Sequence, residues 1–268
     1  EERAVADSMH SAGKNGDVQK LENARDGAEN ISVDTSAERI DSDKVKAKAG
    51  GISENVEPCV EFKDVTFGYD EHIVLKNLNF AIYPGEQVTL TGRTGAGKST
   101  IFKLLLGLYR PDSGEVLIEG EAADRIPDRE KRKKFGYVEQ SFHMVPGTVR
   151  DQITLFDPAI GDEAVQAAAK LVGLHGTIMG LDHGYDTLCK PEIFSQGQWQ
   201  LLSIARAVAG EPGILLLDEI TANLDAETEE MVLEALKNAS EGRTVISISH
   251  RVYQKSGDSQ IRYLTIGS

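Results

Sequence analysis

The residues best suited to chemistry form a glycine-rich segment at positions 92–100, with the sequence GRTGAGKST. It follows a β-prone run, residues 87–91, and precedes an apolar run, residues 101–106, that has the spacing of a buried helix. A glycine loop between a strand and a helix can bring successive backbone N–H groups around an anion, because glycine accepts positive φ and has no Cβ. The segment therefore predicts a phosphate-binding loop.

Two side chains at the end of this loop extend the prediction to a polyphosphate with its metal ion. Lys98 can reach β- and γ-phosphates, and the Ser99 hydroxyl is placed to bind Mg²⁺ beside the positive end of the helix dipole. A glycine-rich turn without a ligand is disfavoured, since three residue types are fixed in the expected context. The residues expected to surround the polyphosphate are Gly92, Arg93, Thr94, Gly95, Ala96, Gly97, Lys98, Ser99 and Thr100.

Two acidic side chains end another predicted strand. Asp218 and Glu219 follow four aliphatic residues, 214–217, which suit a strand buried on both faces of a parallel sheet. We expect Asp218 to hold the shell of the Mg²⁺ ion, and Glu219 to orient or deprotonate the attacking water. The alternative, that both acids only cap the following turn, is weaker beside a phosphate-binding loop.

Two further polar residues end predicted strands at 135–139 and 244–249. At the carboxyl edge of a sheet, Gln140 could reach a ligand, and His250 could hydrogen-bond a γ-phosphate or position water. Taken singly, both residues are equally compatible with ordinary surface or structural roles. Their assignment depends on the remaining pattern.

A second anion-binding helix start is predicted at residues 194–198. Ser195 and Gly197 would present a hydroxyl and free N–H groups at the head of a long helix. One phosphate-binding loop does not easily accommodate a second helix start that faces phosphate. This predicts that the nucleotide is shared between two chains.

Composition limits the class of protein. The chain has 268 residues, 40% of them hydrophobic, which is enough for a substantial core. No run approaches the roughly 20 apolar residues of a membrane span. The formal net charge of −14 argues against non-specific binding to nucleic acid. Cys59 and Cys189 lie far apart without metal spacing, which disfavours a disulfide scaffold or a zinc site.

The chain divides into an N-terminal segment and one globular domain. Residues 1–57 are poor in aromatics and rich in small and charged residues, so we expect a flexible linker or a segment of non-native origin. The start at Glu1 rather than Met suggests a fragment of a longer polypeptide. For residues 58–268 we predict an α/β fold: a P-loop NTPase core with a parallel sheet, an N-terminal antiparallel β subdomain and an α-helical subdomain inserted at about 141–210.

From about residue 59 onward, the sequence resembles the nucleotide-binding domain of ATP-binding cassette (ABC) transporters. The motifs that carry the resemblance are, in order, Walker A at 92–100, the Q-loop at Gln140, the signature at 194–198, Walker B with its catalytic glutamate at 214–219, the D-loop at 222–225 and the switch histidine at His250. Tyr69 falls where the family stacks an aromatic ring on adenine. Residues 145–153 and 181–187 resemble exporter-type domains, which are commonly fused behind a membrane domain.

The resemblance implies an ATPase that uses ATP and Mg²⁺ to drive export across a membrane. The implied catalytic residues are Lys98, Gln140, Glu219 and His250, the implied Mg²⁺ ligands are Ser99, Gln140 and Asp218, and the implied further ATP contacts are Tyr69, Ser195, Gly197 and Gln198. The implied partners are a membrane-spanning domain of the same polypeptide and a second cassette, as homodimer or heterodimer, with no nucleic acid. The implied location is the cytoplasmic face of the cell membrane. The transported substrate is not specified by these residues.

The signature departs from the usual LSGGQ at Phe194 and Gln196, and Trp199 stands where a basic residue is common. The segment between Thr187 and Ser195 is also shorter than is usual. These departures affect the site to which this chain contributes its signature, whereas Glu219 and His250 predict a competent site on its own Walker motifs. Such an asymmetry between two sites would suit a heterodimer.

Two alternatives within the same superfamily stay open. A soluble ABC-type ATPase should have two cassettes or a long coiled-coil insertion. An importer ATPase subunit would normally start with Met near its first strand and lack the exporter-like helical block. A P-loop kinase would have no signature motif.

Overall fold

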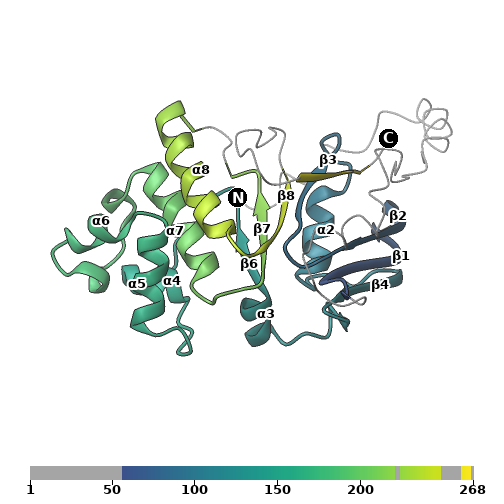
Figure 1. The fold of residues 1–268 in the computed structure, drawn as a ribbon, viewed down its shortest axis with the longest axis horizontal. Coiled ribbons are helices and arrows are strands. Elements are labelled where there is room, and N and C mark those ends of the chain that lie inside the picture. The colour runs from purple at the N-terminus through teal and green to yellow at the C-terminus, as the bar shows by residue number, and fades with distance from the viewer. Residues whose placement is uncertain (1–55, 221–223, 249–260, 267–268) are drawn as a thin grey trace, which may run out of the picture. The chain divides into compact units, whose positions relative to one another are not determined.

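The computed structural model describes residues 56–220, 224–248 and 261–266. These residues form two β-sheets and a set of helices (Figure 1). The expected linker, 1–57, lies outside the described residues except for its last two positions. The expected switch residue His250 also lies outside them.

One sheet is antiparallel, with the strand order β2-β1-β4-β5. Its strands are β1 (Val60–Tyr69), β2 (His72–Ile82), β4 (Ser113–Ile118) and β5 (Glu121–Ala122). Along β1, Val60, Phe62, Val65 and Phe67 are buried, and an irregularity between Phe62 and Val65 returns the apolar side chains to the core after two polar residues. Phe62 stacks on Phe80 of β2 with ring centroids 4.5 Å apart. The antiparallel pairing expected from the alternating pattern is present.

The other sheet is parallel, with the order β6-β7-β8-β3-β9. Its strands are β3 (Gln87–Thr91), β6 (Phe135–Val138), β7 (Ile214–Asp218), β8 (Thr244–Ile248) and β9 (Ile261–Thr265). Ile248 pairs with Leu90 on one side and with Asp218 on the other. Because all these strands run in the same direction, the carboxyl ends of β3, β8 and β7 finish level at one edge of the sheet.

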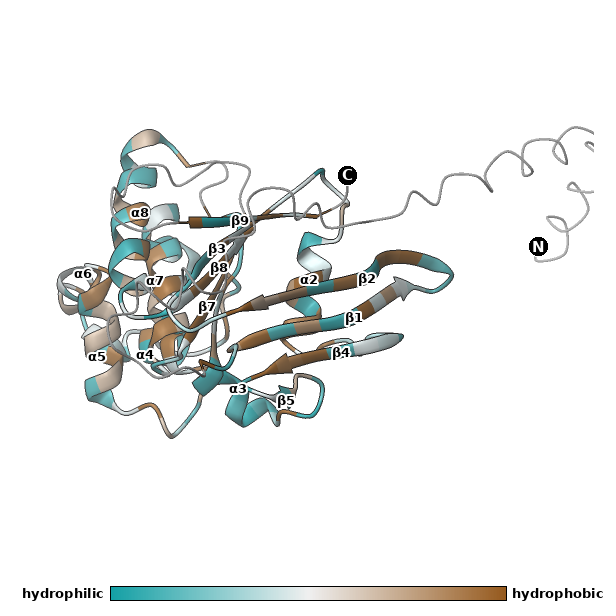
Figure 2. Cartoon of the chain, turned by 45° about the vertical axis from the view of Figure 1, so that its right-hand side comes forward, coloured by the Kyte–Doolittle hydropathy of each residue, from teal (hydrophilic) through white to brown (hydrophobic). Residues whose placement is uncertain are grey.

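The side chains of β7 alternate between two hydrophobic cores. Leu215 and Leu217 belong to the core beneath α7 and α8, whereas Ile214 and Leu216 belong to the core shared with α2 and the antiparallel sheet. All four are buried, as expected for a strand covered on both faces. Figure 2 shows the hydrophobic central strands between the helices and the antiparallel sheet.

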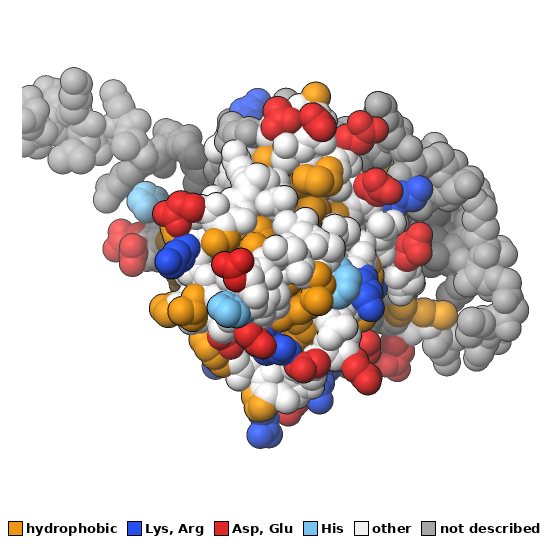
Figure 3. Space-filling model, turned by 90° about the vertical axis from the view of Figure 1, so that its left-hand side faces the viewer, with side chains coloured by type: hydrophobic (Ala, Val, Ile, Leu, Met, Phe, Trp, Pro, Cys, Tyr) orange, Lys and Arg blue, Asp and Glu red, His pale blue; other side chains and the backbone are white. Residues whose placement is uncertain are grey.

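Helices cover both faces of the parallel sheet. They are α2 (Lys98–Leu105), α3 (Asp128–Lys134), α4 (Val149–Thr154), α5 (Asp162–Leu171), α6 (His175–Met179), α7 (Gln196–Val208) and α8 (Ala226–Ser240), with 3₁₀ turns η1 (Gly184–Asp186) and η2 (Pro191–Ile193). Helix α7 packs against α4, α5, α8 and β6. On the face that carries α5 and α6, acidic, basic and hydrophobic side chains are interspersed (Figure 3).

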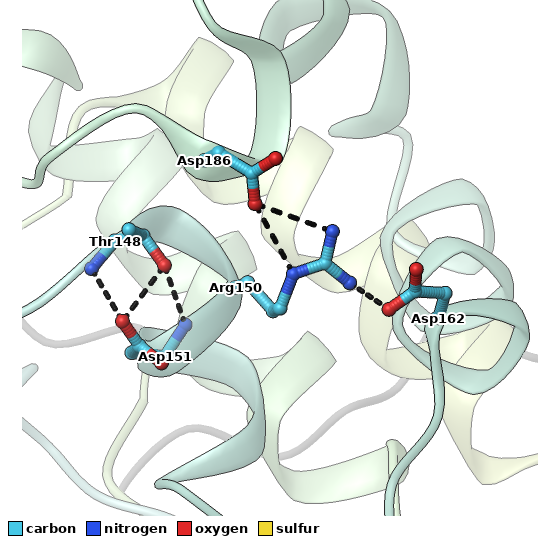
Figure 4. Close-up of polar contacts among 5 residues, drawn as sticks. All are labelled: Thr148, Arg150, Asp151, Asp162 and Asp186. Atoms are coloured by element: carbon cyan, nitrogen blue, oxygen red, sulfur yellow. Dashed lines mark hydrogen bonds and ion pairs between the residues drawn. The ribbon is translucent and has the colours of Figure 1, made fainter.

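Short helices need local stabilisation, and α4 obtains it from a capping box. The Thr148 hydroxyl accepts from the Asp151 backbone N–H over 3.2 Å, while the Asp151 carboxylate accepts from the Thr148 backbone N–H over 2.7 Å. In the same turn, Arg150 bridges Asp162 at the start of α5 and Asp186 in η1 (Figure 4). These contacts fix the mutual positions of three short elements beside α7.

Candidate functional site

The glycine loop is wrapped around a buried lysine. The Lys98 ammonium donates to the carbonyl oxygens of Gly92 and Arg93, at 2.8 and 3.0 Å. The Ala96 N–H donates to the Arg93 carbonyl over 3.1 Å, and other N–H groups of the loop can face an anion. The Lys98 ammonium keeps a third proton for a phosphate oxygen. A Cβ at Gly92, where φ is 141°, would stand 2.2 Å from the carbonyl oxygen of Ile266, so no larger residue fits.

Helix α2 begins directly at the end of the loop. Its N-cap, Gly97, has φ of 93° and no side chain to cap the helix, so the first N–H groups of α2 are free of a capping partner. Lys98 and Thr100 are buried while Ser99 between them is exposed, which presents the Ser99 hydroxyl at the mouth of the loop. The arrangement suits an anion with an associated cation.

The predicted acidic pair lies at the end of β7, two strands away from β3. Asp218 is half-buried and accepts a hydrogen bond of 3.2 Å from the Tyr137 hydroxyl on β6. Burial raises the pKa of Asp218, and the neighbouring Glu219 adds to the rise, while the hydrogen bond from Tyr137 and the charge of Lys98 oppose it. The Lys98 contribution connects Asp218 electrostatically with the glycine loop. Burial also raises the pKa of Tyr137, which keeps its hydroxyl a proton donor.

Glu219 turns away from the strand direction of β7. Its φ is +44°, a left-handed conformation uncommon outside glycine, and its N–H donates to the Ile248 carbonyl over 3.0 Å. A non-glycine residue held there stores strain, and such residues concentrate at functional sites. The sequence could not reveal this conformation.

Gln140 is exposed just beyond β6. Since Val138 pairs with Leu217, the next positions along these two strands, Glu139 and Asp218, lie close to each other, and the charge of Glu139 contributes to raising the pKa of Asp218. Gln140 is therefore brought to the same sheet edge as the acidic pair and the glycine loop. His250 is not described, so its proposed role stays a prediction.

Tyr69 ends β1 beside the first helix. Its hydroxyl lies 3.4 Å from the Thr100 hydroxyl and accepts from Lys103 over 3.4 Å, so the ring is connected to α2. Phe67 and Tyr109 pack edge-on to Tyr69, with centroids 5.0 and 5.4 Å away. The adenine-stacking role expected for Tyr69 stays a prediction.

The predicted signature residues form the start of α7. Ser195 is its N-cap and makes a capping box with Gln198: the Ser195 hydroxyl accepts from the Gln198 N–H over 3.2 Å, and the Ser195 N–H donates to Oε1 of Gln198 over 3.0 Å. Gly197 is needed for packing, because a Cβ there would stand 2.6 Å from Thr228 Cγ2 on α8. Ser195 and Gln196 are both exposed.

Residues 75–222 match the family model described as "ABC transporter". The chain belongs to the ABC transporter family. Its fold is that of an exporter-type ABC ATPase domain: a solved structure of a bacterial Atm1-family ABC exporter with ATP bound superposes with a TM-score of 0.67 at 34% identity, covering 81% of this chain and 39% of that one. The fold class expected from the sequence, and the resemblance to the ABC family, are thereby confirmed.

Curated relatives carry the same domain within longer chains. The chain is 41% identical over 211 residues to the uncharacterized ABC transporter ATP-binding protein YfiC of Bacillus subtilis, covering 78% of this chain and 35% of that protein. It is 35% identical over 226 residues to the alpha-hemolysin translocation ATP-binding protein HlyB of Escherichia coli O157:H7, covering 83% and 32%. The chain thus spans about a third of the length of these relatives. Within its described part, no helix is long and apolar enough to span a membrane.

The residues present suit Mg²⁺ bound together with a nucleotide. Ser99 and Asp218 offer hard oxygen donors, and the loop around Lys98 offers N–H groups to phosphate. Among the described residues, no group of three or more His, Cys, Asp or Glu side chains gathers around a common point. At phosphate-transfer sites, Mg²⁺ usually takes part of its coordination from phosphate oxygens and water.

Two residues of the site were not singled out from the sequence. Tyr137 lies in the middle of β6, and only the pairing of β6 with β7 brings its hydroxyl to Asp218. Phe142 lies two positions after Gln140 and contacts α7, which lies more than fifty positions later in the chain. No local sequence pattern predicts either contact.

Proposed function

We propose that this chain binds ATP with Mg²⁺ and hydrolyses it, and that hydrolysis powers export by an attached membrane domain. The observation that carries the proposal is the meeting of the Lys98 loop, Asp218 and Glu219 at one edge of the parallel sheet. A loop for phosphate, a carboxylate for the metal shell and a second carboxylate beside it form the minimal set for phosphoryl transfer to water.

In this proposal, water attacks the γ-phosphorus in line with the leaving ADP oxygen. A new P–O bond forms to the water oxygen, the bond from the γ-phosphorus to the bridging oxygen breaks, and Glu219 orients the water and accepts its proton. Lys98 and the loop N–H groups hold the negative charge of the phosphates. Bound Mg²⁺, held by Ser99, Gln140 and Asp218, would supply further charge neutralisation.

Other predicted residues would complete the ATP site. Tyr69 would stack on the adenine, and Gln140 and His250 would sense the γ-phosphate. The connection of the Tyr69 hydroxyl to α2 supports its placement near the loop. The stacking role can be tested by substituting Tyr69. Loss of the ring should weaken the binding of ATP but leave the binding of tripolyphosphate, which has no base, unchanged.

A second copy of the domain would complete the site. Ser195, Gly197 and Gln198 stand at the start of α7, where Ser195 is exposed and Gly197 is buried, and a helix N-terminus there can bind phosphate. The glycine loop lies at the start of a different helix, α2, so we propose that these residues contact the ATP of a second cassette. Gln196 places a side chain where the family usually has glycine, which should make this half-site the weaker one in either a homodimer or a heterodimer.

The remaining assignments follow from the relatives. A chain that spans about a third of its relatives leaves room for a membrane-spanning domain in the same polypeptide, with residues 1–57 as linker and 58–268 as the cassette. We propose the cytoplasmic face of the membrane as its place. We favour an exporter over an importer subunit because the solved structure that this chain resembles, which has ATP bound, is that of an exporter.

The test is size-exclusion chromatography with light scattering on the parent and on Glu219→Gln, each with and without Mg²⁺ and ATP. We expect ATP to drive Glu219→Gln into dimers, because the triphosphate is held but not consumed, while the parent turns ATP over. If ATP binds but no dimer forms, the pairing of two copies of this chain is contradicted, and a different cassette must complete the site. If calorimetry detects no ATP binding, the proposed function itself fails.

A further inference from the structure

Tyr69 lies in a cluster of three aromatic rings that two separate segments of the chain supply. Phe67 and Tyr69 come from β1, whereas Tyr109 comes from the turn between α2 and β4. Both neighbouring rings are nearly perpendicular to Tyr69, with interplanar angles of 86° and 88°, and their own centroids lie 5.5 Å apart. Edge-to-face contacts are a favoured geometry of aromatic pairs. The position of the Tyr69 ring is therefore restricted by both neighbours.

Hydrogen bonds also join the backbone of the two segments. The Gly68 N–H donates to Oδ2 of Asp112 over 2.9 Å, and the Asp112 N–H donates to the Thr66 carbonyl over 2.9 Å. Asp112 lies three positions after Tyr109 in the same turn. The end of β1 and this turn are thus held together by hydrogen bonds as well as by the contacts between the rings.

Lys103 reaches the hydroxyl end of the Tyr69 ring from α2. Its ammonium nitrogen lies 3.4 Å from the Tyr69 hydroxyl oxygen and 5.4 Å from the ring centroid, so it stands nearer to the hydroxyl than to the centre of the ring. The same ammonium lies 5.8 Å from the centroid of Tyr109, within the range of a cation–π contact. One lysine therefore contacts both tyrosines of the cluster.

The Tyr69 hydroxyl has a second contact on α2. The Thr100 hydroxyl lies 3.4 Å from it, and Thr100 and Lys103 are three positions apart, so they are neighbours on the surface of the helix. The same helix begins at Lys98, whose ammonium donates to the glycine loop. Helix α2 thus contacts the proposed phosphate site at its start and the Tyr69 ring along its side.

We propose that Lys103 is a positioning residue that holds the Tyr69 ring ready to stack on the nucleobase of ATP. The inference rests on the proposed function, in which Tyr69 contacts the adenine. Tyr69 is half-buried, and a side chain that is ordered only when the ligand arrives lowers the affinity. A ring that Lys103 already holds avoids that loss. Because every base has a π-face, the gain should depend on the presence of a base and not on its identity.

The test compares nucleotides with a phosphate chain that has no base. Titration calorimetry with Mg²⁺-ADP, Mg²⁺-GDP and Mg²⁺-tripolyphosphate is carried out on the parent and on Lys103→Met. Lys103 is exposed, and methionine retains an unbranched side chain without the charge, so the fold should be undisturbed. We expect the variant to bind ADP and GDP about fourfold more weakly and tripolyphosphate as tightly as the parent. In assays of phosphate release, the KM for ATP should rise about fourfold while kcat stays unchanged.

Matched variants separate positioning of the ring from a general loss of charge. Lys103→Arg, which restores a cation with N–H donors, should bind ADP as the parent does. Tyr69→Phe keeps the ring but removes the hydroxyl that Lys103 contacts, so Lys103→Met should weaken ADP binding much less in that background than in the parent. Lys170→Met, which removes the charge of an exposed lysine on α5, should match the parent. Thermal unfolding of each variant controls for loss of structure.

The outcomes distinguish this inference from the function on which it rests. If Lys103→Met binds ADP like the parent, or weakens tripolyphosphate as much as ADP, the positioning role is overturned and the ATPase proposal stands. Additive losses from Lys103→Met and Tyr69→Phe would overturn it as well, because Lys103 would then not act through Tyr69. If the parent binds neither ADP nor ATP, both proposals fail. A loss that is confined to ligands with a base and restored by Lys103→Arg supports the inference.

Discussion

The Tyr137 hydroxyl of β6 donates a hydrogen bond of 3.2 Å to Oδ2 of Asp218 on β7. The contact supports a carboxylate whose own burial disfavours its charge and raises its pKa. Asp218 is thus held in place for a cation at some expense of stability in the free protein.

Replacing that carboxylate by an amide should stabilise the free protein. We expect Asp218→Asn to raise Tm by about 2 °C at neutral pH without nucleotide, because the amide carries no charge to desolvate and can still accept from Tyr137. The folded pKa of Asp218 lies above its unfolded value, so the ionised carboxyl costs stability as pH rises through the interval between them. The Tm difference should therefore shrink as pH falls through that interval, and should be largely gone below about 4, near the ordinary carboxyl pKa.

Calorimetry scans of both proteins across this pH range provide the check, together with Mg²⁺-dependent ATP binding. The variant should gain stability and lose the Mg²⁺ dependence. A variant that is less stable than the parent at neutral pH would show that Asp218 carries a structural contact instead.

The glycine loop makes a sharper prediction, because two of its glycines differ in surroundings. A Cβ at Gly92 would meet the Ile266 carbonyl oxygen at 2.2 Å, whereas a Cβ at Gly95 has nothing within 4 Å, although φ there is also positive. We expect Gly92→Ala to weaken ATP binding on the order of 100-fold, roughly 2.7 kcal/mol of binding free energy. Gly95→Ala should lose only about 1 kcal/mol of binding free energy, from the strain of the backbone. Isothermal titration with ATP compares the two; equal losses would contradict the geometry.

The stability of the short helices beside α7 should depend more on the Thr148 cap of α4 than on the ion pairs of Arg150. Thr148→Ala should cost about 1 kcal/mol in the free energy of unfolding, the usual value of an N-cap. Arg150→Ala should cost less than about 1 kcal/mol, since the side chains of Asp162 and Asp186 are 70% and 72% exposed. Urea unfolding at low and high salt measures both. A larger loss for Arg150→Ala, or one that salt does not reduce, would argue against this ranking.

The sequence predicts those parts of the fold that have a local pattern. Four aliphatic residues before Asp218 indicated a doubly covered strand, and the glycine spacing before Lys98 indicated the loop. The start of α7 at Ser195 was likewise signalled by its cap residue. In each case the physical determinant lies within a few positions of the residue concerned.

Long-range contacts could not be obtained in this way. The Phe142 stack with Trp199 depends on the packing of α7 against β6. The left-handed backbone of Glu219 and the contact of Gly197 with Thr228 also depend on elements distant in sequence. The same limit applies to Tyr137, whose role exists only because β6 pairs with β7.

The most direct test of the central proposal is the rate of phosphate release with Mg²⁺ and ATP, measured for the parent, Glu219→Gln and Glu230→Gln. Glu230 is a matched control, because it is an exposed glutamate on α8, outside the proposed site. We predict that Glu219→Gln lowers the rate roughly 10²- to 10⁴-fold with ATP still bound, as expected on losing a general base. Glu230→Gln should match the parent. A Glu219→Gln protein that releases phosphate at the parental rate would contradict the assignment of Glu219 to the water.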